Sequence, residues 1–282
     1  MRIFSVLALF LCIFGAPLAA QQICGPNALE PGSVLLFTTV DSRAGEGKGT
    51  IISVANTNDS KIIGSSKVWR NGDVFLHYFY VHGDMCKVSN VGNVWLTPND
   101  MLTVFAGTHA PSLLQGYLFV VAEDPETGLF ISFNYLIGKE IIVDMKENKL
   151  WAIPAMAFKC LVRSGRMDNN GRYFSDLNGN KAFDFDGLEY DMWPDKLFIS
   201  SFFHQDKIFE GELTLVSGLG RDWKVFVNFD YYNNDEDPYS FYGYELICWS
   251  HVKLLDISKG FGKLNGTSAE ANSGWARIDS SG

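Results

Sequence analysis

The sequence lacks the short signatures of common hydrolases and nucleotide-binding enzymes. It contains no G-x-S-x-G, no H-E-x-x-H, no P-loop and no G-x-G-x-x-G after a strand pattern. It also lacks a lysine and arginine cluster, and its formal net charge is −9. Because nucleic-acid phosphates need a basic surface, this composition argues against a nucleic-acid partner. These absences favour a protein that does not work by catalysis.

Long apolar segments are missing after the first 20 residues. No later segment reaches the ~18 apolar residues of a transmembrane helix, and the last residues, 279–282, are polar. At the start, Met1-Arg2 is followed by an apolar run from Ile3 to Phe14 and by small residues up to Ala20. This arrangement is typical of a secretory signal peptide. We therefore expect residues 1–20 to be removed and the protein to be periplasmic or secreted, without a transmembrane anchor.

Cysteine is scarce. Cys12 lies in the signal segment, which leaves Cys24, Cys86, Cys160 and Cys248. Their spacing is too wide for a zinc knuckle, and an exported chain favours two structural disulfides over buried free thiols. Four cysteines allow three pairings. If each domain holds its own bridge, Cys24 pairs with Cys86, and Cys160 pairs with Cys248.

Short β-branched and aromatic runs recur along the chain, separated by glycine, asparagine, aspartate and proline. This pattern predicts strands. In the first half the predicted strands are Val34–Val40, Thr50–Ala55, Val74–Val81, Met101–Phe105, Tyr117–Ala122 and Phe130–Ile137. Both faces of Val74–Val81 are largely apolar, so we expect it to be a central strand that is covered on both sides.

Further strands are predicted in the last third of the chain, at Lys196–Phe203, Gly211–Val216, Trp223–Tyr231 and Tyr239–Trp249. The last two should form an antiparallel hairpin. In it, Val225, Val227 and Phe229 share a buried face, and the acidic segment 233–238 forms the turn.

Residues 149–195 interrupt this rhythm. Leu150–Val162 is rich in alanine, methionine and leucine, which predicts a short helix after Pro154, and a polar loop follows. We therefore expect an all-β protein with two antiparallel β-sandwich domains, immunoglobulin-like or jelly-roll-like, at 21–148 and 196–282. A partly helical linker at 149–195 would join them.

The polar loop contains a candidate calcium site. Asp176, Asn178 and Asn180 alternate as the first ligands of a calcium loop do, although Lys181 stands where an EF-hand needs glycine. A looser structural Ca²⁺ site would use Asp176 and Asn178.

Asp184 and Asp186 would complete that site. The alternative is that these residues form turns by bonding their own backbone. No other cofactor is expected. His77 and His82 lie in or beside an apolar strand and are expected to be packed histidines.

The chain resembles a known family through several short sequence motifs. It resembles an uncharacterised family of exported bacterial proteins through Val54–Asn58, Leu96–Asp100, Gly116–Phe119, Asp184–Asp191, Cys248-Trp249 and Ser273–Trp275. The resemblance implies export and a β-rich fold. It brings no activity, substrate or catalytic residue.

Two interpretations of function remain open. The first is a secreted, non-catalytic β-sandwich protein that binds a ligand or associates with a surface through an unidentified partner. The second is a carbohydrate-active protein, either a binding module or a glycoside hydrolase. A row of exposed aromatic side chains on one sheet face would favour carbohydrate, and two carboxylates opposed across a cleft would favour hydrolysis.

Overall fold

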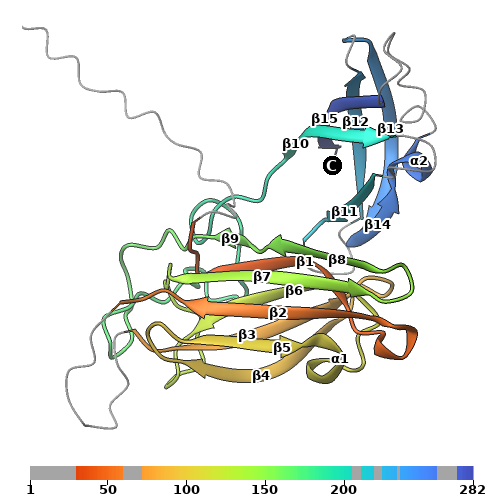
Figure 1. The fold of residues 1–282 in the computed structure, drawn as a ribbon. Helices are drawn as coiled ribbons and strands as arrows, with labels where there is room; N and C mark the ends of the chain where they lie inside the picture. The colour runs from red at the N-terminus through yellow and green to blue at the C-terminus, as the bar shows by residue number, and fades with distance from the viewer. Residues whose placement is uncertain are drawn as a thin grey trace, which may run out of the picture.

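The computed structural model describes residues 30–59, 72–204, 211–218, 224–233, 236–258 and 272–281. Within these ranges fifteen strands form four open antiparallel sheets, which divide between a larger and a smaller body (Figure 1). The described part is therefore all-β, as the sequence predicts. The expected signal peptide and Cys24 lie outside the described residues.

Two sheets pack face to face in the larger body. The first has the order β4-β3-β6-β1-β9, with strands Val88–Leu96, Val74–His82, Gln115–Glu123, Val34–Asp41 and Met156–Phe158. The second has the order β5-β2-β7-β8, with strands Met101–Phe105, Lys48–Asn56, Leu136–Asp144 and Lys149–Pro154. Two single turns of helix, η1 (Ala44–Glu46) and α1 (Ala106–His109), connect strands of this body.

Because side chains alternate between the two faces of a strand, each sheet turns one set of side chains toward the other sheet, and these side chains form the core. Leu76, Tyr78 and Tyr80 on β3 are fully buried there, and Ile52 and Val54 on β2 face them from the other sheet. Burying apolar side chains between two sheets is the main force that holds such layers together.

The five-stranded sheet also buries its other face. Phe119, Val121 and Phe158 pack there against Phe183 and Tyr190 of the segment between β9 and β10. The sheet is therefore covered on both sides, as the two apolar faces of β3 predict.

The smaller body has its own core. A sheet of order β10-β15-β12-β13 contains strands Lys196–His204, Asn272–Ser281, Lys224–Asn233 and Pro238–Ile247. Strands β11 (Glu212–Val216) and β14 (Trp249–Lys253) pair with each other, and the short helix α2 (Leu254–Ile257) follows β14. Val227, Phe229 and Ile278 are buried in the core between these elements.

The hairpin prediction is confirmed for the described residues. β12 and β13 are antiparallel neighbours, and Tyr231 lies opposite Tyr239 beside the turn. Within β12 the side chains of Val227 and Phe229 are buried, whereas Lys224 and Phe226 on the other face are exposed. Trp223 and Asp235 lie outside the described residues.

The predicted helix in 150–162 is wrong. These residues form β8 and β9, which pair with β7 and β1. Pairing buries Ala155, Ala157 and Phe158, so tertiary packing outweighs the helix propensity of alanine and methionine.

Most of the predicted strand Phe130–Ile137 is also wrong. Only single bridges form at Phe130 and Ile131, and β7 begins at Leu136. Strands β4 and β15 were not predicted from the sequence. No helix among the described residues has the length and apolar character that crossing a membrane requires.

Candidate functional site

The candidate calcium residues lie together in the loop before β10, and their oxygens already bind the backbone. Asp176 accepts hydrogen bonds from the N–H groups of Gly179 and Lys181, at 2.7 and 3.0 Å. Asp186 accepts from the N–H groups of Leu188 and Glu189, at 2.8 and 2.9 Å. These are the bonds by which aspartate stabilises turns.

Asn178 and Asp184 meet at the centre of the same loop. The amide groups of Asn178 and Asn180 donate to one oxygen of Asp184, at 2.7 and 2.9 Å. Across the described residues, no three histidine, cysteine or acidic side chains converge in a way that could hold a metal ion. The loop shows turn chemistry, and calcium binding to it stays a prediction.

Glu189 binds the backbone of this loop at Leu177 and Asn178, and its role was not predicted. Its buried carboxylate accepts the N–H of Leu177 at 2.7 Å, while its second oxygen makes no hydrogen bond within the described part of the chain. Burial raises its pKa above the ordinary value.

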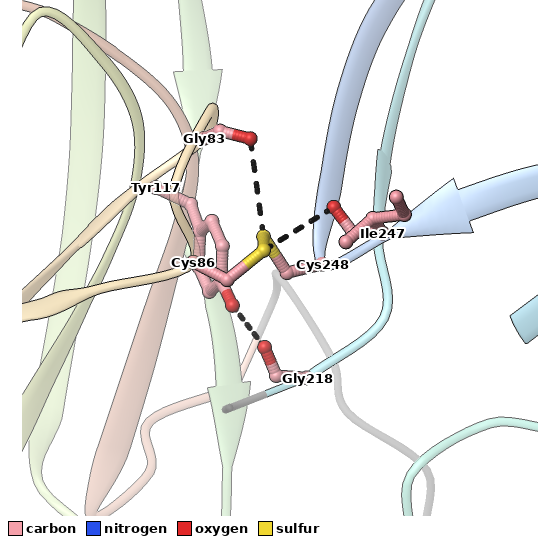
Figure 2. The surroundings of a disulfide bond; sticks show 6 residues. All are labelled: Gly83, Cys86, Tyr117, Gly218, Ile247 and Cys248. Carbon is pink, nitrogen blue, oxygen red and sulfur yellow. Dashed lines mark hydrogen bonds between the residues drawn. A yellow bond between two sulfur atoms is a disulfide. The ribbon is translucent and has the colours of Figure 1, made fainter. Parts of the chain in front are cut away.

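Both predicted pairings, Cys24 with Cys86 and Cys160 with Cys248, are wrong, because Cys86 and Cys248 bind each other. Cys86 and Cys248 form the disulfide, with Cα atoms 5.9 Å apart, and Cys160 is a buried free thiol. The expectation assumed one bridge within each domain. The observed bridge instead joins the loop after β3, in the larger body, to the end of β13, in the smaller one (Figure 2).

Hydrogen bonds beside the disulfide join the same two bodies. Tyr117 donates its hydroxyl hydrogen to the carbonyl of Gly218, close to the bridge (Figure 2). The indole N–H of Trp249 donates to the carbonyl of Thr38 at 2.8 Å. In the smaller body these contacts come from Gly218, Cys248 and Trp249, at and beside β14.

The two histidines that the sequence places in or beside the strand Val74–His82 have polar partners. The Nδ1 atom of His77 lies 2.9 Å from a carboxylate oxygen of Glu123, and the Nε2 atom of His82 lies 3.0 Å from the hydroxyl of Ser89. Both are packed histidines, as the sequence predicts.

The strongest candidate for binding is the outer face of the β10-β15-β12-β13 sheet, opposite the buried core of the smaller body. Because directly paired residues of an antiparallel sheet share a face, the register assigns the side chains. Among the residues whose side chains the structure describes, the outer face carries five aromatic residues from four strands, namely Phe198, Phe226, Tyr232, Tyr242 and Trp275. Phe198 is 67% exposed and Tyr242 is 66% exposed.

Two of these rings form a fixed pair. Trp275 on β15 stands opposite Tyr232 on β12, and their rings stack with centroids 4.3 Å apart and planes 12° apart. Trp275 is still 41% exposed. Stacking holds the indole in place and leaves it accessible to a ligand.

A polar network lies between the aromatic residues. Arg277 forms ion pairs with Asp230 at 2.6 Å and with Asp279 at 3.1 Å. Ser240 and Tyr242 both donate to Asp230, at 2.9 and 3.3 Å. The bond from Ser240, together with Arg277, holds the pKa of Asp230 below its ordinary value, so this carboxylate is ionised at neutral pH.

A depression of about 330 Å³ adjoins Trp275 at one end of the face. Its other lining residues are mainly polar, and they are Ser200, Ser201, Asn233, Glu236, Ser273 and Gly274. Hydroxyl, amide and carboxylate groups therefore stand beside an exposed indole ring. This combination suits a ligand with both apolar and hydrogen-bonding surfaces.

Local sequence patterns do not single out this face. The alternation in 272–281 was its signal, because Trp275, Arg277 and Asp279 alternate with the buried Ala276 and Ile278. A strand prediction there would have placed the tryptophan on the exposed side.

Comparison with known proteins finds only distant structural likeness. No protein-family model matches the chain, and no curated protein does. The protein in the crystal structure of Thermotoga maritima 1070 shares 10% sequence identity with this chain, at a TM-score of 0.31. The match covers 45% of this chain and 95% of that one. The exported protein XepA of PBSX is 10% identical with a TM-score of 0.23, covering 91% of this chain and 84% of that one. Neither likeness is strong enough to assign a fold or a function.

Proposed function

We propose that this chain is an exported, non-catalytic binding protein with two β-sandwich units, and that the outer face of the β10-β15-β12-β13 sheet is its binding surface. The carrying observation is the five aromatic side chains on that face, on the side of the sheet away from its core. Large aromatic residues that gather on one exposed face mark interaction sites more often than chance. The disulfide between Cys86 and Cys248 supports export, because such bonds persist in oxidising compartments.

The chemistry of the depression supports binding over hydrolysis. Glycoside hydrolysis needs two carboxyl groups on opposite sides of the scissile bond. Glu236 is the one acidic residue among the described residues that line the depression. Asp230 and Asp279, elsewhere on the face, are both engaged by Arg277.

Co-sedimentation with washed cell envelopes of the organism that produces the protein tests this proposal. The wild-type protein should sediment with the envelopes, and Trp275→Ala should remain largely in the supernatant. Trp95→Ala is a matched control, because Trp95 is 49% exposed but lies on β4 of the larger body. Equal retention of the wild type and Trp275→Ala, or no retention of the wild type, would reject the outer face as the binding surface.

A further inference from the structure

We propose that the outer face binds an uncharged polysaccharide chain; the inference rests on the proposed function of that face. A sugar ring has apolar C–H faces and a rim of hydroxyl groups. The outer face offers both complements, because aromatic rings and hydrogen-bonding groups alternate across it.

The stacked rings of Trp275 and Tyr232 supply the apolar surface that the face of a sugar ring needs. Tyr232 supports one side of Trp275, so the indole does not have to be ordered when a ligand arrives. Pre-ordering a side chain lowers the entropic cost of binding. A sugar ring laid on the remaining exposed indole surface removes apolar area from water on both partners.

The depression beside Trp275 supplies the hydrogen-bonding groups that sugar hydroxyls need. Ser200, Ser201 and Glu236 are exposed in it and present hydroxyl and carboxylate groups. Hydroxyl groups donate and accept, and a carboxylate accepts from ligand hydroxyls. The polar edge of a sugar that stacks on Trp275 would thus find partners within the same depression.

The other aromatic residues extend the surface along the sheet. Phe226 precedes Tyr232 by six residues on β12, which corresponds to roughly 20 Å of strand. Phe198 and Tyr242 flank this line on β10 and β13. A surface of this length fits a chain of several sugar units better than a single small molecule.

The charges of the face indicate an uncharged ligand. On its strands, three basic and three acidic side chains are described, and these are Lys196, Lys224, Arg277, Asp230, Glu245 and Asp279. Arg277 is paired as described above, and Lys224 lies 2.7 Å from Glu245. A polyanion needs clustered unpaired cations, and a polycation needs clustered unpaired carboxylates. A face with balanced and largely paired charges offers neither.

Two treatments of the envelopes test the ligand class. Periodate cleaves the vicinal diols of glycans and leaves most of the polypeptide chain intact, whereas a protease removes protein receptors. We expect sedimentation of the wild-type protein to be lost after periodate treatment and kept after protease treatment. The opposite pattern would overturn the polysaccharide inference and leave the proposed binding face intact.

Affinity electrophoresis with defined polysaccharides gives the second test. A neutral 1,4-linked glucan, mannan or xylan in the gel, each of which carries vicinal diols, should retard the wild type, and Trp275→Ala should weaken that binding at least tenfold. Trp275→Phe should recover part of the affinity, and Tyr242→Ala, a second site on the face, should also weaken it. Circular dichroism verifies that the variants fold. Retardation by an anionic polysaccharide alone, or an equal loss in Trp95→Ala, would contradict the inference.

Discussion

Single buried polar residues hold the long connection between β9 and β10 against the larger body. Arg172 is 8% exposed, and its guanidinium binds the carboxylates of Asp124 and Asp168. It also donates to the backbone carbonyl of Asp73 at the start of β3. Arginine suits this position because its planar group donates in several directions at once. One side chain thus ties a loop of irregular structure to two strands.

Glu140 is a second buried ionisable residue, and its carboxyl group lies beside an irregularity in β1. Pairing between β1 and β6 shifts between Phe37 and Val40. The carboxylate of Glu140 on β7 accepts the backbone N–H of Thr39, 3.2 Å from each oxygen, and the hydroxyl of Thr38 at 3.2 Å. Burial outweighs these bonds and raises the pKa of Glu140 from 4.5 to about 8.

This pKa makes stability depend on pH. Between pH 4.5 and about 8 the unfolded chain ionises Glu140 while the folded protein keeps its proton, so folding becomes less favourable as pH rises. Urea melts at about pH 5 and about pH 8 should show a fall of a few kcal/mol, and Glu140→Gln should reduce this fall. An identical fall in the wild type and the variant would show that another group is responsible.

At the scale of elements, strands with one or two apolar faces could be predicted. β3, β5 and β12 were predicted within two residues of their observed ends, because their alternation is visible in the sequence. β4 was missed, since its edge position exposes most of its side chains, and Ser89, Asn90 and Gly92 do not resemble a strand. β9 was taken for a helix because pairing with β1, more than 100 residues earlier, decides its conformation.

The candidate site could be predicted only in part. The sequence shows a tryptophan at position 275, but whether its side chain is exposed depends on β15 lying between β10 and β12. Strand order of this kind arises from long-range pairing, which local patterns do not contain. The same reason explains the disulfide, because only the docking of the two bodies brings Cys86 to Cys248.

The β12–β13 hairpin gives a direct test of element assignment. Val227 is 4% exposed in the core of the smaller body, so Val227→Asp places an unpaired charge there and should cost several kcal/mol. Lys224→Ala on the exposed face removes a surface ion pair with Glu245 and a cation–π contact with Phe226, and it should cost less than about 1 kcal/mol. Denaturant melts of both variants compare these costs. Similar midpoints for the two would show that the assigned faces of β12 are wrong.

At the scale of the whole molecule, the two bodies meet through a small joint. The disulfide, the bond from Trp249 to Thr38 and a hydroxyl contact of 3.1 Å between Thr39 and Thr214 cross it. A Cβ atom at Gly83 would overlap the Trp249 ring, so a glycine is needed where the indole packs. Among the described residues, the bonds of this joint come from β11, β14 and the connections beside them, and none of these bonds uses a side chain of the outer face.

Removing the disulfide should therefore loosen the docking of the bodies while each keeps its own core. The bridge closes a loop with a sequence separation of 162 residues, and bridges over long loops contribute about 2–5 kcal/mol.

In Cys86→Ser we expect the smaller body to unfold at lower denaturant than the larger one. Far-ultraviolet circular dichroism and tryptophan fluorescence would then give separate transitions. Cys160→Ala removes a buried thiol that forms no bridge, so the two transitions of this variant should coincide. One coincident transition at the wild-type midpoint in Cys86→Ser would mean that the non-covalent contacts alone hold the bodies together.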